Sequence, residues 1–259
     1  MANLKNYIVL LKLFVTILTM FFCISCNSKK YTITKIEGKN TLIAENQIQN
    51  SEIDNFIKPY REKINSELDK ILAYNPESLD KSKGEWQTNI GNFLADITLA
   101  KGNPVLNKRL NKNIDICLLN HGGIRSILPK GNVSSRNAFE IMPFENSLVV
   151  VALKGEQIQE MANFIITDKK PHPISGMTFV ISTNNSAKNI LIQGKPLEYN
   201  NTYYVATNDY LANGGDKMDF FKKGNQRIDL DYKLRNILID YLVDVDTVQI
   251  KNDIRIIKE

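Results

Sequence analysis

The chain has 259 residues, of which 43% are hydrophobic and 24% are charged, with a formal net charge of +5. These are ordinary values for a globular protein, and the length allows one large domain or two small ones. The charge is mild and spread along the chain, which argues against a nucleic-acid-binding protein.

The first 25 residues have the pattern of a secretory signal peptide. Two lysines precede an unbroken apolar run, residues 13–24, which is too short to span a bilayer comfortably. The ending Ile24-Ser25-Cys26 resembles a bacterial lipobox, in which the cysteine becomes the lipidated first residue. We therefore expect residues 1–25 to be a lipoprotein signal peptide and Cys26 to anchor the chain to a membrane. An uncleaved anchor or a plain signal peptide is the alternative.

Residues 26–50 are expected to form a tether and an N-terminal hairpin. Residues 31–36 alternate between polar and apolar side chains, and Gly38-Lys39-Asn40 predicts a turn into a second apolar segment, residues 41–44. A disordered arm is the alternative.

A long amphipathic helix is predicted to begin at Ser51, a good N-cap residue that is followed by acidic side chains. Apolar residues recur at three- to four-residue spacing as far as Ile71, so one face of this helix is expected to be buried.

A second helix is predicted over residues 90–101, with Asn89 as its cap and Gly102-Asn103-Pro104 as its stop. Further along, an amphipathic helix is predicted over 156–166 and a strand over 177–181. Strands and helices interleave without a strict βαβ repeat. The expected fold is therefore α+β (mixed α/β), with mixed sheets packed against helices.

The most informative stretch joins two apolar runs. The first run, residues 114–119, predicts a buried strand that ends at Asn120-His121-Gly122-Gly123, where the paired glycines allow backbone to approach a ligand. Arg125 follows, with donors that suit a carboxylate or a phosphate. Phe144 precedes the second buried strand, residues 148–153. An amide, an arginine and an aromatic ring on such loops suit a small polar ligand with a flat face.

These residues resemble known motifs. Asn120-x-Gly-Gly-Ile-Arg125 and Pro143-Phe144 are similar to motifs of the C-terminal, substrate-binding domain of the bacterial and animal 5'-nucleotidases. Residues 208–216 (Asn-Asp-Tyr-Leu-Ala-Asn-Gly-Gly-Asp) resemble a later motif, and residues 89–96 resemble an earlier helix of that domain. The motifs follow the order of the family. On this resemblance, residues 51–259 form such a domain.

The resemblance implies that the domain binds a nucleoside or nucleotide. Phe144 and Tyr210 would sandwich the base, because stacking on aromatic rings tolerates different bases. Asp216 would accept hydrogen bonds from the ribose hydroxyls. The alternatives are that both rings belong to the core and that Asp216 is a solvated turn residue.

The remaining implied contacts come from one loop. Asn120 would donate to and accept from the edge of the base, and Arg125 would contact phosphate or ribose, unless it forms an ordinary surface ion pair. Gly122 and Gly123 would permit close backbone approach. Family members place a substrate-binding arginine at the position of Gly84; the adjacent Lys83 would supply charge there without a bidentate fork.

The two-domain 5'-nucleotidases hydrolyse phosphate esters at two metal ions in an N-terminal metallophosphatase domain. This chain has two histidines, His121 and His172, and neither stands in an Asp-x-His or Gly-Asn-His-Glu pattern. Both are interpreted as surface or loop residues. We therefore expect no catalytic residue, cofactor or metal in this chain, and two divalent metals in a partner. Cys117, in an apolar run, is expected to be an inert buried thiol.

Three functions follow from these observations. The first is a substrate-recognition domain of a split 5'-nucleotidase, lipid-anchored in the bacterial cell envelope and completed by a separate metallophosphatase chain. The second is a nucleoside-binding lipoprotein for scavenging or sensing, without a catalytic partner. The third is an independent hydrolase that uses His121, which would need a carboxylate that the sequence does not identify.

Overall fold

The computed structural model describes residues 4–24, 31–40 and 50–259, which belong to two units, Met1–Ser51 and Glu52–Glu259. The first unit contains the helix α1 (Leu4–Ile24). Among the described helices, none is both long and apolar enough to cross a membrane. Cys26, the predicted lipidation residue, lies outside the described residues.

Residues 31–40 contain no strand, where the alternating pattern predicted the first arm of a hairpin. Their apolar side chains are exposed, with Ile33 at 83% and Ile36 at 86%. An isolated two-stranded hairpin is marginal in water, so the alternating pattern alone does not secure one. The second predicted arm, residues 41–44, lies outside the described residues.

The helix α2 (Ser51–Leu68) begins where it was predicted, but the expectation of a buried face is wrong. No residue of α2 is buried, and Phe56 and Tyr60 are 70% and 62% exposed. Side-chain contacts to the rest of its unit lie at its C-terminal end, where Arg136 donates to Asp69 and to Asn65. Hydrophobic spacing identifies an apolar face, but it does not show whether the covering partner belongs to the same chain.

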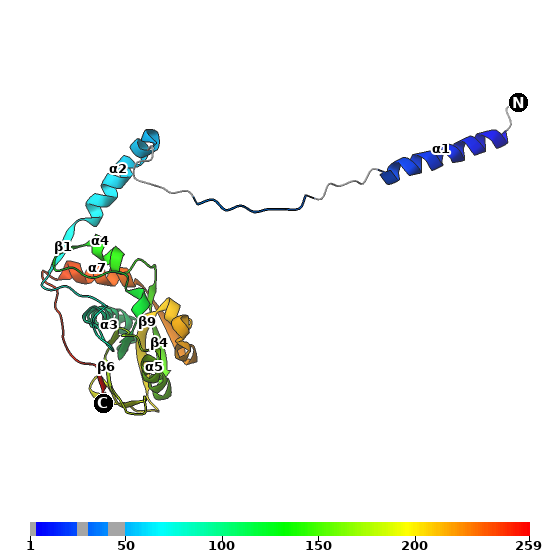
Figure 1. The fold of residues 1–259 in the computed structure, drawn as a ribbon. Helices are drawn as coiled ribbons and strands as arrows, with labels where there is room; N and C mark the ends of the chain where they lie inside the picture. Colours follow the sequence, from blue (N-terminus) through cyan, green and yellow to red (C-terminus); the bar gives the residue numbers. More distant parts are fainter. Residues whose placement is uncertain (1–3, 25–30, 41–49) are drawn as a thin grey trace. The chain divides into compact units, whose positions relative to one another are not determined.

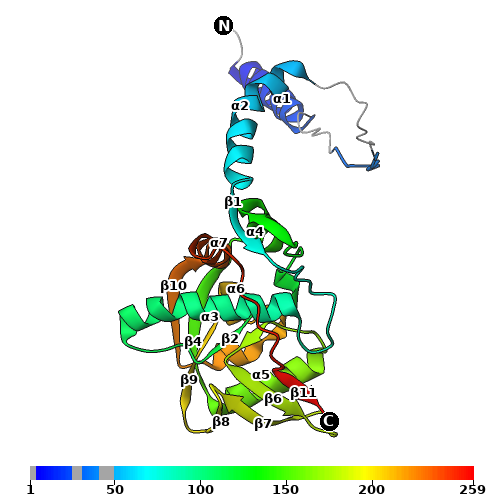
Figure 2. The same ribbon diagram turned by 90° about the vertical axis from the view of Figure 1, so that its left-hand side faces the viewer.

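The second unit is an α+β domain, as predicted (Figures 1 and 2). Its strands are β1 (Ile71–Asn75), β2 (Ile116–Leu118), β3 (Gly131–Ser134), β4 (Ser147–Lys154), β5 (Ile174–Ser175), β6 (Met177–Ile181), β7 (Ala187–Ile192), β8 (Lys195–Pro196), β9 (Thr202–Asn208), β10 (Gln226–Lys233) and β11 (Ile256–Lys258). Its further helices are α3 (Asn89–Leu110), α4 (Ser135–Ile141), α5 (Gly155–Asp168), α6 (Asp209–Ala212) and α7 (Leu234–Asp244), with 3-10 turns η1 (His121–Gly123), η2 (Gly215–Lys217) and η3 (Asp219–Lys223).

The central sheet has the strand order β10-β4-β9-β2-β5, in which only the β2–β9 pair is parallel. The other sheets are β11-β6-β7-β8 and the pair β1-β3. Alternate residues of β4 enter two cores: Leu148 and Val150 pack with α3 and α7, whereas Val149 and Val151 pack with α5 and the β6–β7 sheet. Because both faces of β4 are covered, its sequence is a continuous apolar run instead of an alternating one.

The helix α3 is longer than predicted. Thr88, not Asn89, caps it by accepting a hydrogen bond from Gly91 N at 3.0 Å. Gly102 does not stop the helix but lies against β4, where an added Cβ would come within 2.8 Å of Leu148 Cδ2. The helix continues past the exposed Pro104 and ends at Asn111, which has a φ of 53°. The glycine therefore serves close helix–sheet packing.

Candidate functional site

Three loops meet at the end of the central sheet where the strands β2 and β9 finish. The parallel strands β2 and β9 end side by side, because Cys117 pairs with Ala206, and the antiparallel β4 begins there, with Leu148 opposite Asn208. The loop after β2 (residues 119–125), the loop before β4 (residues 142–146) and the segment after β9 therefore meet. Ligand sites form where the carboxyl ends of neighbouring strands open in this way.

A cleft of about 400 Å³ opens between these loops. It is lined by all seven residues that the sequence analysis singled out and by one more. They are Asn120, Gly122, Gly123, Arg125, Phe144, Tyr210 and Asp216, together with Asn146. The volume lies within the usual range for small-molecule sites.

Two aromatic side chains that are 66 positions apart in the sequence, Phe144 and Tyr210, line the cleft. Phe144 is 47% exposed and Tyr210 is 48% exposed, so neither ring is a core residue. The guanidinium of Arg125 lies 6.0 Å from the centroid of the Phe144 ring, which is the outer limit of a cation–π contact. Half-exposed rings at a cleft have faces available for stacking on a flat ligand.

A hydrogen-bonded chain fixes the carboxylate of Asp216. Asn120 donates to Oδ2 at 2.7 Å, and the hydroxyl of Tyr210 donates to Oδ1 at 2.9 Å. Behind them, the buried Asn208 donates to Asn120 Oδ1 at 3.5 Å and caps α6 by accepting from Leu211 N. Each oxygen of Asp216 keeps a second lone pair, so the carboxylate can still accept from a ligand. Asn120 thus orients Asp216 in addition to lining the cleft.

The two glycines before Asp216 allow this arrangement. Gly214 has a φ of 84°, which favours glycine. Gly215 lies under the ring of Tyr210, and a Cβ there would come within 2.4 Å of Tyr210 Cε1. Asp216 itself adopts a φ of 51°, a conformation that non-glycine residues hold at some cost and that is common at functional sites.

Asn146 is the lining residue that the sequence analysis missed. Its backbone oxygen accepts from Leu234 N at the start of α7, which anchors the loop, and its side chain is partly exposed at the cleft. The signal was its place two residues after Phe144, in the same short loop before β4. An amide there can both donate to and accept from a ligand.

The position that aligns with the family's arginine requires a glycine in this chain. Gly84 has a φ of 111°, and a Cβ would lie 1.9 Å from the backbone oxygen of Gln87. Lys83 is exposed, whereas Lys81 reaches the ligand loop by donating to the backbone oxygen of Ile124. Lys81 is therefore better placed than Lys83 to supply positive charge near Arg125.

The two histidines lie beside the cleft and differ in burial. His172 is 2% exposed, so its interpretation as a surface or loop residue is wrong with respect to burial. His121 is partly exposed, and its Nδ1 is buried with no hydrogen-bond partner among the described residues. Burial, with the charges of Lys81 and Lys170, lowers the pKa of His121. In the described part of the chain the hydrogen-bond partner of its ring is the backbone of Pro171 and not a carboxylate, so this arrangement does not favour the independent-hydrolase hypothesis.

Cys117 is buried and free, as expected, and burial raises the pKa of its thiol. The thiol is therefore unreactive at neutral pH.

The family model of the 5'-nucleotidase C-terminal domain matches residues 71–223, which is more than half of the chain. The chain belongs to this family. The match contains every residue that lines the cleft, and it ends before β10, α7 and β11.

Two curated relatives show the extent of the likeness. The trifunctional nucleotide phosphoesterase protein YfkN of Bacillus subtilis is 26% identical over 226 residues, which cover 81% of this chain and 14% of that protein. A 5'-nucleotidase of Vibrio parahaemolyticus is 23% identical over 85% of this chain and 38% of its own length. A further relative, from Listeria monocytogenes, is named a cell wall protein.

Solved structures share the fold. The 5'-nucleotidase precursor of Thermus thermophilus superposes with a TM-score of 0.66 and 24% identity, over 80% of this chain and 43% of the other. The NAD nucleotidase of Haemophilus influenzae gives a TM-score of 0.63 and 16% identity. This chain spans less than half the length of each relative and structure named here.

Proposed function

We propose that the chain is the nucleoside- or nucleotide-recognition domain of a split 5'-nucleotidase. The observation that carries the proposal is the cleft, in which Phe144 and Tyr210 offer ring faces beside the fixed carboxylate of Asp216. A purine or pyrimidine stacks on such rings, and a ribose diol donates to such a carboxylate. Arg125 and Lys81 supply positive charge for a phosphate.

The phosphate-cleaving chemistry is assigned to a separate metallophosphatase chain. Two-metal hydrolysis needs several carboxylates and histidines around bridged cations. This chain has two histidines, and His172 is already committed to Asp168 and to the backbone of His121. We therefore propose that the two divalent metals and the attacking water belong to the partner.

We further propose that Cys26 carries lipid and holds the domain on the bacterial cell envelope. The support is the apolar run that ends in Ile24-Ser25-Cys26. Acylation by two or more chains gives stable membrane anchoring. A domain held there would act on nucleotides outside the cytoplasm.

The split-enzyme proposal predicts that the purified full chain binds AMP but releases no phosphate from it, with or without manganese. Phosphate release is expected to appear when a metallophosphatase chain that copurifies from native membranes is added. The control adds the same metallophosphatase fraction to the variant Phe144→Ala. Phosphate release should then stay low, because neither the partner nor the variant supplies the complete base clamp.

Rapid phosphate release by the chain alone would contradict the proposal that recognition and hydrolysis belong to separate chains. Binding of AMP without any copurifying metallophosphatase would favour the nucleoside-scavenging or sensing lipoprotein.

Asp216→Asn is expected to weaken adenosine binding by about tenfold, because a hydrogen bond to a charged group contributes roughly 1.5–3 kcal/mol. The amide also presents a donor toward Asn120 or Tyr210, where the carboxylate accepts. Calorimetry with adenosine and with 2',3'-dideoxyadenosine measures the effect. The dideoxy ligand is the control, since it cannot donate to this carboxylate. An equal loss for both ligands would show that Asp216 acts only by holding Tyr210.

A further inference from the structure

We propose that His172 is a positioning residue that fixes the Asn120–Gly123 loop at the cleft and makes ligand binding depend on pH. The inference rests on the proposed function, because the loop that His172 holds is the one that carries Asn120, Gly122 and Gly123.

The observation is a chain of contacts, the relay, that runs from a helix end through the buried ring of His172 to the ligand loop. Asp168, the last residue of α5, lies 2.9 Å from Nε2 of His172. On the other side of the ring, Nδ1 lies 3.2 Å from the backbone nitrogen of His121. The imidazole packs on Phe164, with ring centroids 5.9 Å apart.

These contacts fix the tautomer of His172. A backbone N–H is always a donor, so Nδ1 must accept and cannot carry a proton. Nε2 then carries the proton and donates to Asp168. The ring of His172 thus makes a neutral hydrogen bond at Nδ1 and a charge-assisted one, to the carboxylate of Asp168, at Nε2. A second proton, on Nδ1, would point directly at the N–H of His121.

The segment that carries His172 holds the ligand loop at two points. Leu119 N donates to the backbone oxygen of Pro173 at 2.9 Å, so the segment beside His172 runs along the loop from its first residue. His172 Nδ1 accepts from His121 N, two residues further along the loop. The amide of Asn120, between these two anchors, donates to Asp216. Displacing His121 N therefore moves the group that orients the carboxylate.

The charges around His172 set the pH at which the relay fails. Burial lowers the pKa of His172 from its ordinary value of 6.5, against the opposing effect of Asp168. Further titratable groups that face His172 are Lys170, in the loop after α5, and His121, in η1. Asp216 and Lys217 of η2 line the same cavity, which has a volume of about 350 Å³. Hydrogen bonds from His172 and Lys170 lower the pKa of Asp168, although burial alone would raise it.

The sign follows from the lowered pKa. Above pH 6.5 His172 is neutral in both folded and unfolded chains, and the relay is intact. As the pH falls below 6.5, the unfolded chain takes up the proton first, and the folded loop follows at a lower pH. Ligand binding and loop stability are thus full at neutral pH and are lost on the acid side.

The test is calorimetric titration of the full chain with adenosine between pH 7.5 and 5.0. We expect the dissociation constant to rise toward the acid end of this range, by about tenfold once His172 is protonated, since a buried donor left without an acceptor costs about that factor. His172→Asn places an amide oxygen near the position of Nδ1 and cannot titrate. It should bind within about threefold of the wild type at pH 7.5 and lose the pH dependence.

His172→Leu removes the acceptor and should bind about tenfold more weakly at every pH. His121→Asn keeps the backbone N–H and removes the other titrating ring, so it should retain the wild-type pH profile. An unchanged profile in His172→Asn, or a flat profile in His121→Asn, would overturn the proposal.

A second readout separates this inference from the proposed function. As the pH falls below 6.5 and the folded His172 takes up its proton, hydrogen exchange of the His121 amide should accelerate relative to amides of β4 in the wild type and not in His172→Asn. If adenosine fails to bind at any pH, the proposed function is contradicted, and the exchange of the His121 amide still tests the role of His172. If adenosine binds but the exchange of the His121 amide depends neither on pH nor on residue 172, only the role proposed for His172 is contradicted.

Discussion

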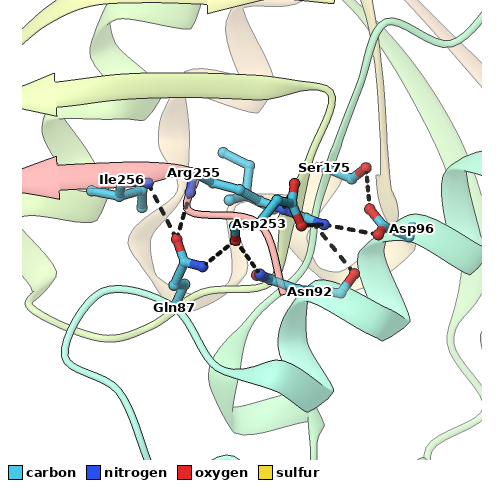
Figure 3. Close-up of polar contacts among 8 residues, drawn as sticks. Gln87, Asn92, Asp96, Ser175, Asp253, Arg255 and Ile256 are labelled. Atoms are coloured by element: carbon cyan, nitrogen blue, oxygen red, sulfur yellow. Dashed lines mark hydrogen bonds and ion pairs between the residues drawn. The ribbon is translucent and has the colours of Figure 1, made fainter. Parts of the chain in front are cut away.

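Replacing Arg255 with methionine is expected to lower the free energy of unfolding by about 3–5 kcal/mol, because it leaves a partly buried carboxylate without its cation. The side chain of Arg255 is 4% exposed, and that of its partner Asp96 is 22% exposed. Figure 3 shows the side chain of Arg255 reaching from the C-terminal segment toward Asp96 and Asn92 of α3, while Gln87 contacts the backbone of the same segment.

The network around Arg255 explains the size of the effect. The guanidinium donates to Asp96 Oδ2 at 2.8 Å, to Asp253 Oδ1 at 3.0 Å and to the backbone oxygen of Ile174 in β5. Ser175 donates to the other oxygen of Asp96 at 2.6 Å. The carboxylates hold the pKa of Arg255 above its usual value in spite of burial. One side chain thus joins β11 to α3 and β5.

Denaturant unfolding measures this prediction, with Lys188→Ala as the matched control. Lys188 pairs with Glu259 at the end of the chain, but both side chains are 43% exposed, so the control should cost less than about 1 kcal/mol. Arg255→Lys should fall between the two, because an ammonium cannot bridge two carboxylates as a planar fork does. A loss below 1 kcal/mol for Arg255→Met would show that the network does not secure the C-terminal strand.

Phe144→Ala is expected to weaken adenosine binding by up to about a hundredfold, since stacking of a base on an aromatic ring is worth roughly 1–3 kcal/mol. Phe144 is half exposed and lies outside both hydrophobic cores, so its loss should leave the stability of the domain nearly unchanged. Tyr210→Ala should weaken binding at least as much, because it also releases Asp216.

Calorimetry with adenosine measures both variants, and the melting temperature controls for folding. Phe56→Ala is the control for a lost phenylalanine ring, because Phe56 lies in α2, is 70% exposed and is not among the residues that line the cleft. Wild-type affinity in Phe144→Ala would contradict the clamp. A loss of affinity in Phe56→Ala equal to that in Phe144→Ala would show that the loss is not specific to the cleft.

The sequence predicted the fold where local pattern and tertiary context agree. The apolar runs 114–119 and 148–153 became β2 and β4, and the helix predicted over 156–166 became α5, with Ile158, Met161 and Ile165 buried. Each is a long apolar or periodic segment whose partner covers the expected face.

The sequence misled where one residue had two possible uses. Gly102 stands in a helix-stop pattern, yet it permits the close approach of α3 to Leu148, and that contact is 46 positions away along the chain. The apolar face of α2 was real, but the described residues do not bury it. Periodicity carries no information on what packs against a face.

For the site, the motifs identified seven residues that the fold brings to one cleft. Two residues that hold the surrounding structure in place, His172 and Arg255, belong to no motif and could not be identified from the sequence. His172 appeared to be an isolated loop histidine, because its partners are a backbone nitrogen and a helix-end carboxylate. Arg255 lies 159 positions from Asp96, in a segment without any motif. Positioning contacts of this kind depend on the assembled fold.

The most direct test of the central claim is a calorimetric titration of the wild-type full chain with adenosine in the presence of a metal chelator. The account predicts saturable binding at one site per chain, because the residues of the proposed recognition site all belong to this chain and the proposed contacts involve no metal. Absence of saturable binding for both adenosine and AMP would contradict it.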